Sequence, residues 1–191
     1  MHDIRTVPAK LVPCLLLSLM LLPATPVHSA NRLLVSDFGV KILDPESGEF
    51  LGFFGETEGK FVGGLAVHPA TGNIFATVNR PDGGIGEYDR NGGAFVGTFG
   101  ETAANLTNAM KAAFHPTTHH LFVLDDAVKQ FDGTTGAFLG SFSETAKLRA
   151  AIDIDFHPTT GNLFLATREI LEFDGTTGAL VGSFGETAAN L

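Results

Sequence analysis

The sequence predicts an all-β protein: a β-propeller of about four blades with four antiparallel strands each, forming an incomplete or open ring. Three observations lead to this prediction. One segment recurs every 42–45 residues, each period contains four short strand-like runs, and turn signals separate these runs. No stretch combines helical length with an apolar period of 3.6 residues, so we expect no substantial helix.

Two independent landmarks define the repeat. The hairpin segment FDGTTGALVGSF at 173–184 has close copies ending at the same phenylalanine, and these residues, Phe54, Phe99, Phe142 and Phe184, are 45, 43 and 42 residues apart. A His-Pro turn is the second landmark, with His68, His115 and His157 separated by 47 and 42 residues. Two landmarks with one period make chance similarity a poor explanation.

The last unit shows the expected order of elements. The innermost strand, 150–156, ends at His157-Pro158, because proline lacks the N–H that a sheet ladder needs. The next strands are 162–167, rich in β-prone residues, and 169–173, which alternates in polarity. A DGTTG hairpin then leads into the outer strand, 179–184.

Recurring polar residues at the turns favour structural roles. An aspartate precedes each hairpin turn, at Asp44, Asp89, Asp132 and Asp174, which indicates an Asx turn. The histidines of the His-Pro segments are expected to cap their own turns. His119 replaces the turn glycine of the other units, and histidine is among the residues that tolerate a left-handed backbone.

The first 29 residues are typical of a secretory signal peptide. Arg5 and Lys10 precede a twelve-residue apolar run at 11–22, and small residues follow before Ala30. A run of this length is too short for a membrane span of about 20 residues, so we expect no span after cleavage. The mature chain, 30–191, is then expected to contain a partial blade (30–57) and three full blades (58–102, 103–145 and 146–191).

The mature chain is expected to hold fifteen strands, one fewer than four blades need. The absent strand is an innermost one, so the chain is either a fragment of a longer propeller without independent function or one whose ring is completed by a homo-oligomer. An open arc leaves sheet faces uncovered, which favours association.

Composition excludes some partners. The net charge is −9, and such an acidic surface repels nucleic-acid phosphates and anionic membranes. The single cysteine, Cys14, lies in the predicted signal peptide, so the mature core must be stable without disulfides. No nucleophile elbow, phosphate-binding loop, dinucleotide fingerprint or zinc motif is present.

The combination of FDGTTGAFLGSF at 131–142 with FHPTTGNLFLAT at 156–167 resembles the secreted bacterial propellers built from NHL-type repeats. The resemblance covers residues 31–191 and is specific for the repeat. It implies a six- or seven-bladed ring, and it leaves activity open, because related propellers include scaffolds, carbohydrate or protein binders and a few enzymes. The chain departs from the pattern in its His before Pro and its lack of tryptophan.

The loops between second and third strands all lie on one rim and differ between units. Variation on a repeated scaffold is where binding sites are usually placed. We therefore expect a ligand site among seven residues of this rim: Asp37, Asn79, Arg80, Asp82, Asp125, Asp126 and Arg168. Its carboxylates would suit Ca²⁺ or a cationic partner, and no other cofactor is expected.

Two further groups are weaker candidates. Lys111, Asp153 and Asp155 fall on innermost strands and should line the central channel, where they could bind a cation or ligand, pair with each other or face water. His115, His119 and His120 form the densest group of imidazoles and are the only place where we expect that adventitious zinc or copper could bind.

The resulting hypothesis is a secreted or periplasmic, non-catalytic propeller module that binds a protein or glycan through its rim. The alternative from a different class is a lactonase-like propeller hydrolase or lyase with a channel metal. Inner-strand positions hold mainly Gly, Ala, Ile and Val, which disfavours the metal ligands that such an enzyme needs.

Overall fold

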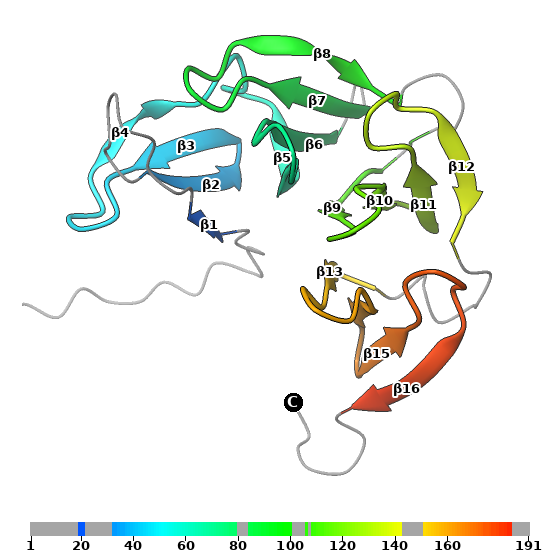
Figure 1. Cartoon of the computed structure of the whole chain (residues 1–191). Coiled ribbons are helices and arrows are strands. Elements are labelled where there is room, and N and C mark those ends of the chain that lie inside the picture. Colours follow the sequence, from blue (N-terminus) through cyan, green and yellow to red (C-terminus); the bar gives the residue numbers. More distant parts are fainter. Residues whose placement is uncertain are drawn as a thin grey trace, which may run out of the picture.

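The structure, a computed structural model, describes residues 19–21, 32–79, 84–100, 106, 108–142 and 151–184. These residues contain sixteen strands in four sheets, here called blades 1 to 4, and no helix (Figure 1). Blade 1 holds β1 (Leu19–Leu21), β2 (Leu33–Asp37), β3 (Gly39–Leu43) and β4 (Phe50–Phe53), and blade 2 holds β5 (Phe61–Val67), β6 (Ile74–Asn79), β7 (Gly84–Tyr88) and β8 (Phe95–Phe99). Blade 3 holds β9 (Lys111–Phe114), β10 (Leu121–Leu124), β11 (Val128–Phe131) and β12 (Phe138–Ser141), and blade 4 holds β13 (Asp153–Phe156), β14 (Leu163–Ala166), β15 (Ile170–Phe173) and β16 (Leu180–Phe184).

Each blade is an antiparallel meander in sequence order. The blades follow one another along an open arc, with β5, β9 and β13 toward its centre and β8, β12 and β16 on its outer edge (Figure 1). This arrangement confirms the predicted all-β class and the four four-stranded blades. Within the described part of the chain, no helix is long and apolar enough to cross a membrane.

The described part of the predicted mature chain, 30–191, holds fifteen strands, β2 to β16, as expected. The sixteenth strand is β1, which pairs with β2 through Leu19↔Val35 and Leu21↔Leu33. It lies inside the segment predicted as a signal peptide, where the apolar run was interpreted only as a targeting signal. A short apolar run meets the requirements of an innermost strand as well as those of a signal core.

Local turn geometry matches the sequence prediction closely. The Oδ1 atom of Asp132 accepts bonds from the N–H groups of Thr134 (3.0 Å) and Thr135 (2.7 Å), and Asp174 does the same with Thr176 and Thr177. These are the predicted Asx turns. Bonds from the backbone N–H and hydroxyl of Thr135 lower the pKa of Asp132, and those of Thr177 lower the pKa of Asp174; the N–H groups of Thr134 and Thr176 add to the effect.

The histidines of the His-Pro segments also cap their turns. In His68, His115 and His157, Nδ1 accepts bonds from the N–H groups two and three residues ahead, at 3.1–3.2 Å. His119 has a φ of 59°, and the corresponding Gly72 and Gly161 have φ values of 74° and 73°. His119 therefore adopts the left-handed conformation of the glycines that it replaces.

The hydrophobic core is divided among the three junctions between blades. At each junction, one face of a blade packs against the opposite face of the next blade. Phe54 of blade 1 packs with Ile74 and Tyr88 of blade 2, and Phe122 of blade 3 packs with Leu163 and Leu165 of blade 4. The blade is thus the repeating unit, and the apolar contacts between neighbouring blades stabilise each unit.

Gly55 illustrates how tightly the junctions fit. Its φ is +65°, and a Cβ atom there would lie 2.6 Å from the Gly93 carbonyl oxygen of blade 2. Gly48 has a similar φ, +73°, but nothing lies within 4 Å of its Cβ position. A comparison of the two glycines therefore separates the cost of a left-handed backbone from the cost of a steric clash at the junction.

We expect Gly55→Ala to destabilise the protein by about 3 kcal/mol and Gly48→Ala by only about 1 kcal/mol. The left-handed backbone costs an L residue about 1 kcal/mol or somewhat more at both sites, and overpacking adds about 2 kcal/mol at Gly55 alone. Urea unfolding followed by circular dichroism measures both. Equal losses would show that the junction adapts to the extra methyl group.

Candidate functional site: the rim between second and third strands

The rim consists of four connections, one per blade, and the predicted site residues fall on all of them. Asp37 ends β2, Asp125 and Asp126 follow β10, and Arg168 lies between β14 and β15. Asn79 is the last residue of β6 and pairs with Phe61 of β5. Arg80 and Asp82 lie outside the described residues. The described members of the predicted set are therefore spread around the rim and do not converge on one point.

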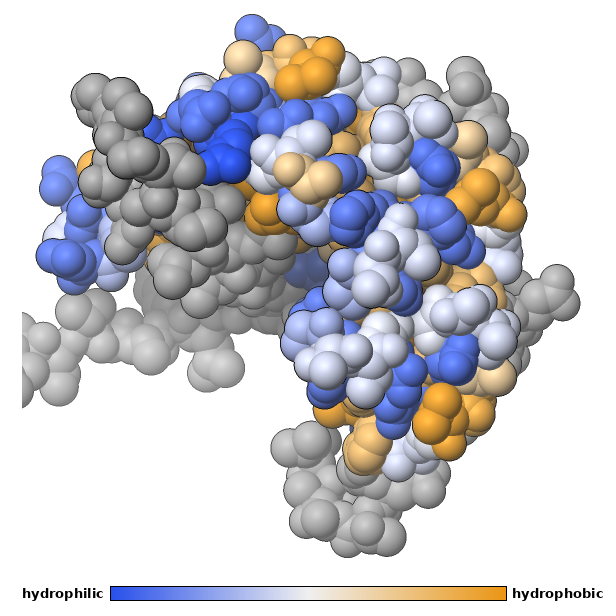
Figure 2. All heavy atoms as spheres, viewed as in Figure 1, coloured by the Kyte–Doolittle hydropathy of each residue, from blue (hydrophilic) through white to orange (hydrophobic). Residues whose placement is uncertain are grey.

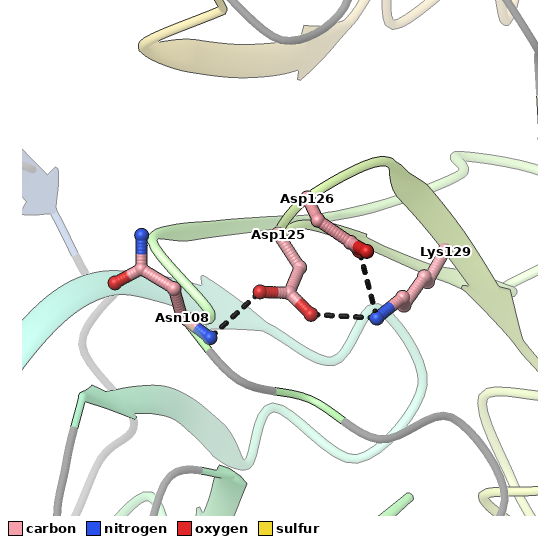
Figure 3. A network of polar contacts seen from close by, with 4 residues as sticks. All are labelled: Asn108, Asp125, Asp126 and Lys129. Atoms are coloured by element: carbon pink, nitrogen blue, oxygen red, sulfur yellow. Dashed lines mark hydrogen bonds and ion pairs between the residues drawn. The ribbon is translucent and has the colours of Figure 1, made fainter.

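The best-defined polar network of the rim lies in blade 3 (Figure 3). The Nζ atom of Lys129 lies 2.6 Å from Asp125 Oδ2 and 2.9 Å from Asp126 Oδ1. The other oxygen of Asp125 accepts a bond from the Asn108 N–H at 2.7 Å. Asp125 thereby ties the rim turn to the segment that leads into β9.

Burial separates the two aspartates. The Asp125 side chain is fully buried and that of Asp126 is 72% exposed. Burial lowers the pKa of Lys129, but its hydrogen bonds to Asp125 and Asp126 outweigh burial, and the net shift is upward. Hydrogen bonding to Lys129 lowers the pKa of Asp126. Both carboxylates therefore face a cation within the chain, and of the two only Asp126 is open to a partner.

Blade 1 carries a looser version of the same pair. Asp37 and Lys41 occupy the positions of Asp125 and Lys129 in the repeat, and their closest atoms are 3.0 Å apart. Both side chains are more exposed than their blade 3 counterparts. The Oδ1 atom of Asp37 is buried without a hydrogen-bond partner, as is the hydroxyl of the adjacent Ser36.

Blade 4 has no such pair. The hydroxyl of Thr167 accepts from the Glu169 N–H and donates to the Glu169 carbonyl, which closes the turn locally. Leu171 stands where the lysine stands in blades 1 and 3, and Arg168 is exposed. The blade 4 turn therefore offers a cationic side chain where blade 3 offers a carboxylate.

Sequence reasoning missed an aromatic pair on the rim. Phe38 of blade 1 forms an isolated bridge with Phe61 of blade 2, and their rings meet edge to face with centroids 5.8 Å apart. Phe38 is 63% exposed and Phe61 43%. Phe38 takes the place that Asp126 has in blade 3, and this change of type within the repeat was the signal available in the sequence.

The channel candidates lie on neighbouring inner strands. Lys111 of β9 is buried, and burial lowers its pKa while the charge of Asp153 opposes that shift. Lys111 and Asp153 feel each other's charge but form no ion pair within 4.0 Å. Asp153 and Asp155 each accept a bond from the next residue's N–H. The channel site remains a prediction.

The imidazole group near His115 is engaged in local contacts. His120 Nδ1 lies 2.8 Å from the Gln130 amide nitrogen, and the His119 ring packs edge to face with His68 of blade 2. Among the described residues, no three His, Cys, Asp or Glu side chains are placed to hold a metal ion. Metal binding by His115, His119 and His120, like calcium binding at the rim, stays a prediction.

Two of the turn-capping histidines reach across blade junctions. His68 packs edge to face on Phe114 of blade 3, and His115 packs in the same way on Phe156 of blade 4. Burial is the main reason that the pKa values of His68 and His115 lie below the usual 6.5. A neutral ring also suits the cap, because Nδ1 accepts two bonds and a protonated Nδ1 accepts none.

This arrangement predicts a loss of stability in weak acid. A histidine with a lowered folded-state pKa binds protons more readily when unfolded, so its contribution is complete above pH 6.5 and declines as pH falls below it. We expect the free energy of unfolding to fall between pH 7 and pH 5, and the double variant His68→Asn/His115→Asn to flatten this dependence. Urea unfolding of the wild type and the double variant at several pH values measures both dependences, and equal slopes would contradict the prediction.

Comparison with solved structures places this geometry in a known fold. The chain is similar to one in the crystal structure of a nidogen/laminin complex, with a TM-score of 0.61 and 19% identity over 80% of this chain and 61% of that one. It is similar also to the hydrazine synthase of Kuenenia stuttgartiensis, with a TM-score of 0.61 and 12% identity over 80% of this chain and 45% of that one.

These similarities show the fold alone. The chain spans less than two thirds of either structure, and the identities are too low to carry over an activity. No protein-family model and no curated protein matches the sequence. The described residues form a β-propeller fold with four blades.

Proposed function

We propose that this protein is a secreted or periplasmic NHL-type propeller that acts as a non-catalytic interaction module and binds a protein partner through its rim. The observation that carries the proposal is the exposed Phe38–Phe61 pair at the junction of blades 1 and 2. Large exposed aromatic side chains that face each other on a surface are typical anchors of protein interfaces.

The surroundings of the pair indicate the chemistry of the partner. Asp37 precedes Phe38, and its side chain is 17% exposed and pairs with Lys41. Asp126, on the same rim, is exposed. A partner that inserts an apolar side chain beside the rings and presents a donor or basic group to the carboxylates fits this surface. The similarity to a chain from a nidogen/laminin complex supports a protein partner over a glycan.

Export follows from the predicted signal peptide at 1–29. Cleavage before Ala30 would remove β1, so blade 1 of the exported protein would keep β2, β3 and β4 and present the free inner edge of β2. A free strand edge accepts a further strand readily. Mass spectrometry of the protein recovered from the exporting cell measures whether the chain begins at Ala30.

The test of rim binding uses a displayed library of random peptides as the probe. Peptides selected on the wild-type protein are measured by calorimetry against Phe38→Ala and against Phe95→Ala, which removes an exposed phenylalanine from outer strand β8. We expect Phe38→Ala to weaken binding at least tenfold, because such anchors contribute 2 kcal/mol or more, and Phe95→Ala to leave binding unchanged. A glycan array probed with the same two variants tests the glycan alternative. Peptides that bind both variants equally would contradict the proposal.

A further inference from the structure

Three repeat positions form the face with which each blade covers the next. The first is held by Leu34, Phe75 and Phe122, the second by Val40, Ile85 and Val128, and the third by Phe54, Phe99 and Phe142 in blades 1 to 3. The first two positions are at most 1% exposed in all three blades, and Phe142 is the only partly buried residue at the third. This face, called the leading face here, is apolar wherever a blade follows.

Blade 4 keeps the same residue types with no described blade following it. Phe164, Ile170 and Phe184 occupy the three positions. Ile170 is 47% exposed, Phe184 is 50% exposed and Phe164 is half-buried. His157 is also exposed, whereas His68 and His115 are buried against the next blade. The leading face of blade 4 therefore has the apolar composition of an interface. It is exposed, whereas the equivalent faces of blades 1 to 3 are buried against the next blade.

The opposite, trailing face of blade 1 is the matching half. In blades 2 to 4 this face carries Ile74, Leu121 and Leu163 at one position and Tyr88, Phe131 and Phe173 at another, all at most 2% exposed. Blade 1 carries Leu33 and Leu43 at these positions, and both are only partly buried. At each of the three junctions within the chain, the leading face of one blade packs against the trailing face of the next blade.

We propose that the leading face of blade 4 binds the trailing face of blade 1 of a second copy of this chain. The occupant is a second copy because both halves of the contact are present on one chain, and the contact continues a junction that the structure already shows three times. Head-to-tail association of this kind uses two different surfaces, so it closes into a ring or continues into a longer array. The proposal does not involve the rim and stands apart from the proposed function.

The carboxylate of Asp155 opposes the contact. Asp155 lies on the leading face of blade 4, where it pairs across the sheet with Phe164. The equivalent residues of blades 2 and 3 are Ala66 and Ala113, both buried. Covering Asp155 with a second blade costs desolvation of a carboxylate. The junction between copies is therefore weaker than the three internal junctions, and the association is reversible and depends on concentration.

The first experiment measures the mass of the whole chain by light scattering and sedimentation over a range of concentrations. We expect the wild type to form species of at least twice the monomer mass, and Ile170→Asp to raise the dissociation constant at least tenfold. The matched control is Val181→Asp in β16. Val181 is exposed, and its equivalents Leu51, Val96 and Leu139 are exposed in every other blade, so they belong to no junction. Figure 2 shows such apolar patches over the outer edge of the arc.

The second experiment tests the head-to-tail arrangement itself. Ile170→Asp blocks the leading face and leaves the trailing face intact, whereas Leu43→Asp does the reverse. Each variant alone should remain a monomer, and an equal mixture should form a one-to-one dimer through the one intact pair of faces. Circular dichroism of each variant confirms that it is folded. Asp155→Ala, which installs the alanine of blades 2 and 3, should strengthen self-association.

The proposal is overturned if the wild type is a monomer at all concentrations, or if Val181→Asp disrupts association as strongly as Ile170→Asp. It is also overturned if the mixture of the two blocked variants stays monomeric although both are folded. An unchanged or weakened association of Asp155→Ala would show that the leading face of blade 4 is not in contact with the second copy.

Discussion

Replacing Phe122 by alanine should destabilise the protein by about 3–5 kcal/mol, the usual cost of removing a phenylalanine from a packed core. Phe122 is fully buried at the junction of blades 3 and 4. Its ring meets those of Phe142 and Phe156 edge to face, each with centroids 4.9 Å apart. The loss is a large fraction of the 5–15 kcal/mol that stabilises an ordinary domain.

The position of Phe122 gives this prediction a local signature. Within the described residues, blade 4 packs against blade 3 alone, so a cavity at this junction weakens everything that holds blade 4 in place. Amide hydrogen exchange should therefore speed up most in β13 to β16 and least in blade 1. Thermal unfolding measures the overall loss, and exchange with mass spectrometry locates it.

Phe95→Ala is the control for the same change of side chain. Phe95 is about half-exposed on outer strand β8, and its ring touches only the edge of the junction through Tyr88, at a centroid distance of 5.5 Å. Its removal should cost about 1 kcal/mol or less, as for most substitutions on a surface. If Phe122→Ala and Phe95→Ala lose equal stability, the stabilising role assigned to the junctions is wrong.

The fold followed from the sequence because the repeat reports the same local physics several times. Each Asp before a hairpin and each His before a proline accepts hydrogen bonds from backbone N–H groups of its own turn. These bonds are formed as predicted. The exceptional His119 fits the same logic, since histidine is among the residues that tolerate the positive φ of the glycines it replaces. Turn geometry of this kind can be predicted from a few neighbouring residues, without knowing which blades are in contact.

The site was less accessible to sequence reasoning, because it depends on contacts between blades. Nothing in the order of residues indicates that Phe38 reaches Phe61, 23 positions ahead, across a blade boundary. β1 was missed for a different reason, since an apolar run near an N-terminus matches two physical descriptions at once. Asp125 was predicted as a rim residue without its buried lysine, because the burial of a side chain in a loop follows from the neighbouring segment at Asn108.

Replacing Asp125 by alanine is expected to cost about 3 kcal/mol of stability. Removing one member of a buried ion pair leaves the other charge without its main compensation. Lys129 is itself 9% exposed, and its contact with Asp125 is shorter than its contact with the exposed Asp126. The same change also removes the acceptor for the Asn108 N–H, which joins the rim turn to β9. Chemical unfolding of the variant measures the sum of the two effects.

The repeat supplies a matched control in Asp37→Ala, which breaks the equivalent pair of blade 1. There the side chains of Asp37 and Lys41 are 17% and 35% exposed, and pairs of this kind contribute about 1 kcal/mol or less. Asp125→Asn separates the two roles of Asp125, since it keeps an acceptor for Asn108 and removes the charge. If Asp125 were chiefly a ligand-binding residue, its alanine variant would be no less stable than Asp37→Ala and would lose only peptide binding. A loss of stability well beyond that of Asp37→Ala assigns Asp125 to the scaffold of the rim, and leaves Asp126 and the Phe38–Phe61 pair as the surface that a partner meets.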